Sequence, residues 1–187
     1  MRARRNWRRQ QPSLDPARLI FIDESSAKTN LTRLRGRAER GQRVHGAAPH
    51  GHWNSTTVIG AMRLDGSTAC MAIEGATDLE VFGTYVRQVL YPFLKPGDVV
   101  IMDNLAAHKS ETILALIRQA GAEALFLPAY SPDLNPIEKM WSKLKHILRS
   151  LEARTLPALM AAIGQALKAV TSQDAINWFA SCGYNFI

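Results

Sequence analysis

Residues 129–141 read AYSPDLNPIEKMW, a pattern typical of a loop that turns into a helix. Asn135 suits the position that caps a helix, Pro136 the first helical position, and Glu138 the third, where a carboxylate often completes a capping box. Apolar residues then recur at intervals of four, three, four and three positions, which predicts one apolar helix face that packs on a sheet. These residues are Ile137, Trp141, Leu144, Leu148 and Leu151. Capping alone would explain Glu138, so a chemical role requires partners elsewhere in the chain.

The sequence around this stretch predicts a mixed α/β domain. Short apolar runs without helical length favour buried strands at residues 18–23, 98–103 and 124–127. Two further strand-like runs flank Asp65-Gly66, a strong hairpin signal, at 55–64 and 67–73. Helical spacing and end signals predict helices at 79–93, 111–120, 157–170 and 173–181. We therefore expect an antiparallel hairpin start, then parallel strands, with helices flanking the sheet.

Two carboxylates close predicted strands, Asp23 in RLIFID and Asp103 in DVVIMD. Because sites in such sheets gather at the carboxyl ends of strands, we expect these side chains to lie near each other. Neighbouring carboxylates repel unless cations neutralise them, and oxygen-only ligands select hard ions such as Mg²⁺ or Mn²⁺. With Glu138 as a third acid, the set suits two cations about 4 Å apart that act on a phosphodiester.

The expected geometry of the strands excludes two other acidic residues from this set and leaves one alternative. Asp98 opens the strand that Asp103 closes, so the two should lie roughly 17 Å apart. Glu24 follows Asp23 directly, and its side chain should point to the opposite face of the sheet. Asp133 remains an alternative to Glu138, because it lies five residues earlier in the same loop, although Ser-Pro-Asp is also a common turn.

Histidines provide weaker signals. His108 follows Asp103 by five residues and is expected on the loop that leaves the strand, where it would reach a substrate phosphate or transfer a proton. His50 and His52 form a His-x-His pattern without a third ligand at zinc spacing nearby.

Basic residues indicate a polyanionic partner. The 187-residue chain carries a net charge of +7, and five of its positive charges lie among the first nine residues. Residues 1–17 are predicted to be a basic flexible arm or linker, with Trp7 available to stack on a base, and residues 18–187 one domain. Candidate DNA-binding residues are Arg4, Arg5, Arg8 and Arg9 in the arm and Lys139, Lys143, Lys145 and Arg149 on the helix after Glu138. A solubilising tail and a solvated helix face are the alternatives.

The sequence contains neither a predicted membrane span nor a signal peptide. No apolar run reaches the roughly 20 residues needed to span a bilayer, and no signal peptide opens the chain, so we expect a cytoplasmic, nucleoid-associated protein without a membrane partner. Cys70 and Cys182 lack CxxC spacing and are expected to be small core residues.

Three ordered blocks resemble a known family. IDES at residues 22–25, MDNxxxH at 102–108 and YSPxLNPIExxWxxLK at 130–145 are similar to the motif blocks of the mariner-like transposases, in their bacterial insertion-sequence branch. The thirty-four residues between Asp103 and Glu138 match the spacing of that branch. The resemblance covers about residues 18–149.

This resemblance implies an RNase H-like fold and a DDE centre of Asp23, Asp103 and Glu138 that holds Mg²⁺ or Mn²⁺. It marks Asn104, His108 and Asn135 as active-site supports. It implies cleavage at transposon ends and strand transfer, in which a 3′-hydroxyl attacks target DNA. Because two ends are cut, we expect a homodimer.

The chain departs from this family at its start. Full-length members carry helix-turn-helix modules, which leads us to expect a separate helix-turn-helix DNA-binding polypeptide. The alternatives are an RNase H-like nuclease without strand transfer, or an inactive transposase-derived DNA-binding protein.

Overall fold

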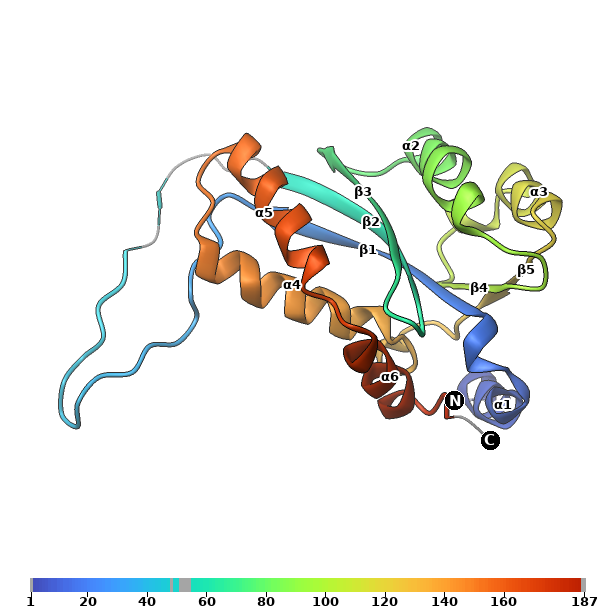
Figure 1. Ribbon diagram of the computed structural model, residues 1–187, viewed down its shortest axis with the longest axis horizontal. Coiled ribbons are helices and arrows are strands. Elements are labelled where there is room, and N and C mark those ends of the chain that lie inside the picture. The colour runs from blue at the N-terminus through green and yellow to red at the C-terminus, as the bar shows by residue number, and fades with distance from the viewer. Residues whose placement is uncertain (1, 48, 51–54, 186–187) are drawn as a thin grey trace.

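The computed structural model describes residues 2–47, 49–50 and 55–185, and in it five strands form one sheet in the order β3-β2-β1-β4-β5 (Figure 1). The antiparallel part comprises β1 (Leu19–Lys28), β2 (Ser55–Arg63) and β3 (Thr68–Glu74), and the parallel part adds β4 (Val99–Met102) and β5 (Glu123–Phe126). Gly66 has a φ of +83° in the β2–β3 turn, as the predicted hairpin requires. The mixed sheet is confirmed.

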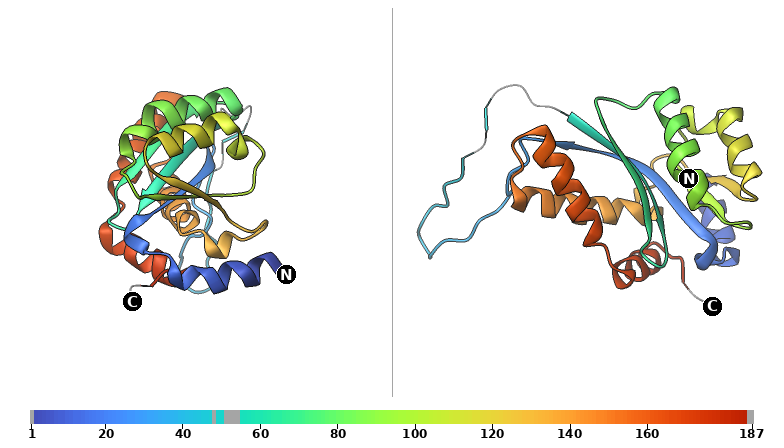
Figure 2. Two further views of the ribbon diagram at one scale, coloured as in Figure 1. Left: turned by 90° about the vertical axis from the view of Figure 1, so that its right-hand side faces the viewer. Right: turned by 45° about the horizontal axis from the view of Figure 1, so that its top comes forward.

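Helices cover both faces of the sheet (Figures 1 and 2). On one face lie α2 (Leu79–Tyr85), which continues as a π-helical turn (Val86–Leu90), and α3 (Glu111–Gln119). The other face packs against α4 (Ile137–Leu151), α5 (Leu156–Lys168) and α6 (Ser172–Ser181). Side chains of β1 alternate between the two cores, since Phe21 lies in the α4 core and Ile20 and Ile22 in the α2 core. Among the described residues, no helix is both long and apolar enough to cross a membrane.

Strand β1 is longer than its sequence pattern predicts. Asp23 was expected to end it, but the strand continues to Lys28 because β2 pairs along its length, with Asp23 opposite Gly60. The parallel neighbour β4 pairs only with residues 19–21. Asp23 therefore stands inside β1, just beyond the point where the β4 pairing stops.

A glycine on β2 allows α4 to pack tightly on the sheet. A Cβ atom at Gly60 would lie 2.8 Å from the Cys70 sulfur and 2.8 Å from the Trp141 ring. Trp141 is 2% exposed and comes from the second turn of α4. The absence of a side chain at Gly60 thus sets how closely the helix that carries Glu138 approaches the strand that carries Asp23.

The predicted flexible arm at residues 1–17 is wrong, because residues 2–10 form the helix α1 (Arg2–Gln10). Trp7 is 6% exposed, and its indole N–H donates to the Tyr184 hydroxyl at 3.1 Å. Gln11 donates to the Cys182 carbonyl at 2.7 Å. One buried aromatic side chain thus anchors an otherwise polar segment, and Trp7 is not available to stack on a base.

The Asn135 side-chain cap predicted for α4 is wrong, and other residues cap α2 and α6. Helix α4 begins after Pro136, and the backbone carbonyl of Asn135, not its side chain, accepts from the Glu138 N–H at 3.2 Å. Asp78 caps α2 by accepting from the Val81 N–H at 2.8 Å. In α6 the capping box pairs Thr171 with Asp174.

The Asp174 carboxylate should stabilise the fold in a pH-dependent way. Hydrogen bonds from Lys143 at 2.5 Å and from Thr171 lower its pKa to about 2. Because the folded-state pKa is depressed, the contribution is fully present above the unfolded value of about 4 and is lost as the pH falls toward 2. Urea unfolding of wild type and Asp174→Asn should therefore differ at pH 6 and converge near pH 2. Lys143→Met should move this window upward, and a pH-independent difference would contradict the assignment.

Candidate active site

Three carboxylates line one cavity of about 440 Å³ beyond the carboxyl ends of β4 and β5. Asp23 comes from β1, Asp103 follows β4 directly, and Glu138 is the second residue of α4. Asn104 and Asn135 also line the cavity, together with the loop that contains residues 127–132. Within the described part of the chain, no three acidic, histidine or cysteine side chains form a ready-made metal cluster. All three predicted acids nevertheless line the same cavity.

Asp23 lies in an electrostatically unfavourable position. Burial raises the pKa of its carboxyl group to about 7, although the Glu24 backbone N–H donates to it at 2.8 Å and lowers the value. The charges of Glu138 and Asp103 raise it further. A carboxylate that is partly desolvated and faces two like charges gains from a nearby cation.

Asn135 faces this carboxylate instead of capping α4. Its side chain is 4% exposed, and its amide nitrogen lies 3.4 Å from the Asp23 Oδ2. Its Oδ1 is buried and has no hydrogen-bond partner among residues 2–47, 49–50 and 55–185. The Asn135 amide group thus contacts Asp23 through its nitrogen, while its oxygen is buried without a partner.

His108 lies behind Asp103 rather than on an open loop. Its Nδ1 is 2.7 Å from Asp103 Oδ1, its Nε2 is 3.8 Å from Glu24, and its ring packs 4.4 Å from that of Phe82. Burial lowers the pKa of His108, but the Asp103 and Glu24 carboxylates outweigh this effect and raise it to about 9. Although burial opposes it, contact with His108 lowers the pKa of Asp103. The predicted reach to a substrate phosphate is wrong, because the side chain is 1% exposed.

Asp133, the alternative third acid, points away from the cavity. Arg4 of α1 donates to its two oxygens at 2.8 and 2.7 Å, and Arg8 lies 3.4 Å from it. Asp133 is absent from the residues that line the cavity, whereas Glu138 is among them. Nothing in the sequence connects Arg4 with a residue 129 positions away, so this ion pair was not predicted.

The predicted basic residues fall into two groups. Arg4 and Arg8 pair with Asp133, and Lys143 pairs with Asp174 at 2.5 Å, so these side chains have structural partners. Arg5, Arg9 and Lys139 are exposed, and Lys145 and Arg149 are half-buried. Of the histidine pair, His50 is exposed and His52 lies outside the described residues.

The fold and the cavity define a class of protein: an RNase H-like domain with carboxylates from its central strands and from the helix α4. A family model described as DDE superfamily endonuclease matches residues 18–160. The chain belongs to this DDE endonuclease family.

Curated relatives are transposases of transposable elements. The Tc1 transposase of Caenorhabditis elegans is 30% identical over 90 residues, which is 48% of this chain and 33% of the relative. The Tcb1 transposase of Caenorhabditis briggsae is 28% identical over 102 residues, or 52% and 37% of the two chains. The matched parts thus span about a third of the relatives' length.

Solved structures share the fold. The Mos1 strand transfer complex superposes with a TM-score of 0.74 at 16% identity, covering 96% of this chain and 57% of the Mos1 chain. The catalytic domain of Mos1 mariner transposase gives 0.60 at 14% identity, covering 98% and 89%. The catalytic core of BIV integrase gives 0.52 at 17% identity, covering 81% of each chain. These similarities confirm the RNase H-like fold.

Proposed function

We propose that this domain catalyses metal-dependent DNA strand cleavage at transposon ends and transfer of the resulting 3′ end to target DNA. The observation that carries the proposal is the meeting of Asp23, Asp103 and Glu138 at one cavity in a DDE-family domain. The names of the curated relatives and of the Mos1 strand transfer complex support the transposase assignment.

Oxygen ligands at the cavity fit a divalent metal. The three carboxylates match the preference of Mg²⁺ and Mn²⁺, and Mos1 paired-end complexes are described with each of these metals. We propose that Asp23, Asp103 and Glu138 hold two ions. When bound, such ions activate the attacking oxygen and stabilise the leaving oxygen of a phosphodiester.

The surrounding side chains would orient these ligands. A positively charged His108 holds Asp103 from behind and compensates its charge. Asn135 sets the orientation of Asp23 through its amide group, and Asn104 lies at the cavity where it would contact substrate. Helix α4 fixes Glu138 relative to the sheet through the packing of Trp141.

Metal binding is expected to change the melting temperature, a measurement independent of activity. Mg²⁺ or Mn²⁺ at a hundred times its dissociation constant should stabilise wild type by about 2.7 kcal/mol. Asp23→Asn should melt higher than wild type without metal, because a crowded negative charge is removed, and should lose most of the metal-induced shift. Glu80→Gln, an exposed change on α2, is the control and should keep the full shift. Equal metal-induced shifts in all three proteins would contradict the ligand assignment.

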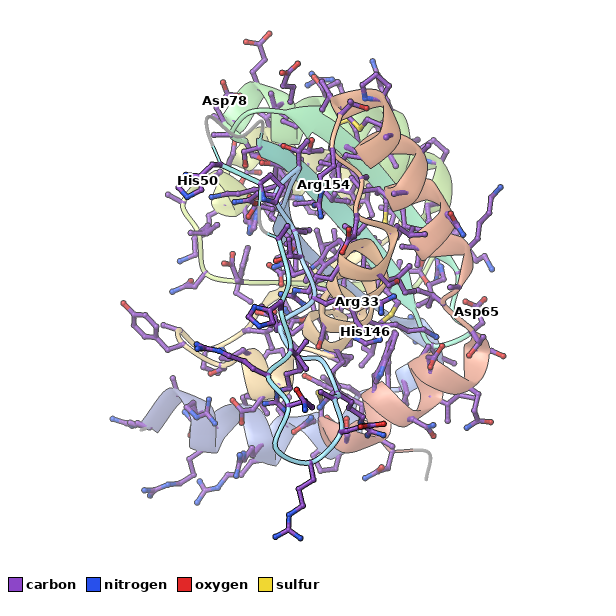
Figure 3. The ribbon with its side chains drawn as sticks, turned by 90° about the vertical axis from the view of Figure 1, so that its left-hand side faces the viewer. Arg33, His50, Asp65, Asp78, His146 and Arg154 are labelled. Carbon is purple, nitrogen blue, oxygen red and sulfur yellow. The ribbon has the colours of Figure 1, made fainter. Side chains whose placement is uncertain are left out.

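Basic surfaces suggest how DNA approaches. Residues 29–47, which follow β1, extend away from the sheet and helices (Figure 1) and carry exposed arginines at positions 33, 35, 37, 40 and 43, of which Arg33 is labelled in Figure 3. Arg154 donates to the carbonyls of Thr29 and Leu31 at 3.2 and 2.8 Å and anchors the base of this segment. The arginines of this segment supply positive charge for contacts with DNA phosphates, as do Arg5, Arg9, Lys139, Lys145 and Arg149. DNA binding should therefore weaken steeply as the salt concentration rises.

Assembly with other chains is also proposed. Because a transposon has two ends, we propose that two copies of this chain act together as a homodimer. A separate helix-turn-helix polypeptide would supply recognition of the terminal repeat. Nucleoid association would follow from DNA binding.

An assay on labelled DNA with its terminal inverted repeat tests the function. With Mg²⁺ or Mn²⁺, the expected products are nicked transposon ends and, when target DNA is added, strands joined through their 3′ ends. Cleavage without joined products would favour the nuclease alternative. Salt-sensitive binding without divalent-ion-dependent cleavage would favour an inactive DNA-binding protein.

A further inference from the structure

Tyr130 has an unusual position at the rim of the acidic cavity. Its side chain is 99% exposed, and it is one of the residues that line the cavity. Its backbone has a φ of +55°, in the left-handed region that non-glycine residues rarely adopt. A large aromatic side chain in a strained, solvent-facing position is unfavourable in the free protein, and such strain concentrates at functional sites.

A contact from α1 holds this position in place. The Arg4 guanidinium donates to the Ser131 Oγ at 2.8 Å and to both Asp133 oxygens, and it lies 3.4 Å from the Tyr130 carbonyl. Ser131, directly beside Tyr130, is 6% exposed. The backbone under the Tyr130 ring is thus fixed although the ring itself faces solvent.

A second brace acts on the far side of the same loop. The Trp7 indole N–H donates to the Tyr184 hydroxyl at 3.1 Å, and this hydroxyl donates to the Leu134 carbonyl at 2.8 Å. Residues 130–134 are therefore held from two points of the N-terminal segment. A rigid aromatic ring loses little conformational freedom when it binds a ligand.

We propose that the Tyr130 ring is a stacking platform for a nucleobase adjacent to the phosphodiester that enters the acidic cavity. This inference rests on the proposed function. A strand whose phosphate reaches Asp23, Asp103 and Glu138 has its neighbouring bases at the cavity rim, where Tyr130 presents a flat apolar face. Stacking on an aromatic side chain accepts any base, so it fits a site that contacts DNA of varied sequence.

A double-mutant cycle, in which Tyr130 and single DNA bases are changed separately and together, tests whether Tyr130 stacks on a base. Affinity is measured by fluorescence anisotropy on a labelled duplex with the terminal inverted repeat, in an Asp103→Asn background that prevents cleavage. Tyr130→Ala should weaken binding roughly 5- to 150-fold, the range for loss of one stacked base, while Tyr130→Phe should bind like its parent. Leu79→Ala, another exposed apolar residue, serves as the control on α2 and should have no effect.

Abasic nucleotides placed one at a time near the cleaved phosphate identify the stacked base. At one position the abasic change should weaken binding of the parent but not of Tyr130→Ala. If every abasic position affects both proteins equally, or if Tyr130→Phe binds as weakly as Tyr130→Ala, stacking is overturned. These results are independent of the cleavage assay, so stacking can fail while the proposed transposase activity holds, and the reverse.

The brace is tested in the same cycle. Arg4→Ala should reduce the coupling between Tyr130 and the stacked base, because the loop is released, whereas Arg2→Ala at an exposed position of the same helix should preserve it. Equal coupling in the two variants would show that α1 does not fix the platform.

Discussion

Replacing Asp103 with asparagine is expected to lower the rate of DNA strand cleavage at least about a thousand-fold, a loss typical of removing a central catalytic group. The carboxylate lies directly after β4 at the cavity and is held by His108 at 2.7 Å. Its loss would remove a proposed metal ligand and leave the charged His108 without the nearer of its two carboxylates. Single-turnover cleavage of end-labelled DNA measures the effect, and retained full activity would contradict the proposed mechanism.

Comparison of two other acids sharpens this test. Glu138→Gln should lose as much activity as Asp103→Asn, since Glu138 lines the same cavity. Asp133→Asn should lose no more than about ten-fold, because it breaks only a partly exposed ion pair with Arg4. A larger loss in Asp133→Asn than in Glu138→Gln would make Asp133 the third ligand. DNA affinity should be retained in Asp103→Asn and Glu138→Gln, which separates catalysis from binding.

Replacing Asp98 with alanine is expected to destabilise the fold by about 3–5 kcal/mol. The Arg63 and Asp98 side chains are each 6% exposed and are joined by two contacts, at 2.9 and 2.6 Å. Asp98 also accepts from the Lys95 N–H at 2.6 Å, and the Arg63 guanidinium lies 4.7 Å from the centre of the Phe93 ring. Alanine would leave a buried guanidinium without its counter-charge.

Urea unfolding measures this loss. Glu111→Ala breaks the exposed Glu111–Arg118 pair and should cost less than about 1 kcal/mol. The double change Arg63→Met with Asp98→Leu should recover much of the stability, because apolar residues often replace a buried pair without penalty. A loss below about 1 kcal/mol in Asp98→Ala would show that water reaches the pair.

Local patterns in the sequence were sufficient to predict the sheet. Apolar runs and the Asp65-Gly66 turn predicted the strands, and alternation correctly placed Glu24 on the face opposite Asp23. Asp98 was excluded from the acidic set, and it lies buried against Arg63. Helical spacing likewise identified the face of α4 that packs on the sheet, except at its end, where Leu151 is 39% exposed.

Long-range contacts explain what was missed. The arm at residues 1–17 looked disordered because its composition is polar, yet burial of Trp7 against Tyr184 orders α1. The predicted Asn135 cap was wrong because the Asn135 side chain faces Asp23, a residue far away in the sequence. The placement of His108 beneath Asp103 depends on Phe82, which belongs to a different helix. The catalytic roles, the DNA-binding residues and the bacterial insertion-sequence origin stay predictions.

Gly60 has a consequence for how this sequence can diverge. Any side chain at this position would collide with the Trp141 ring and the Cys70 sulfur, and the resulting displacement of α4 would move Glu138. A larger residue at position 60 is therefore tolerable only in a lineage that has also acquired smaller residues at positions 70 and 141. Positions 60, 70 and 141 are thus expected to covary among homologues, even though none of them lines the cavity.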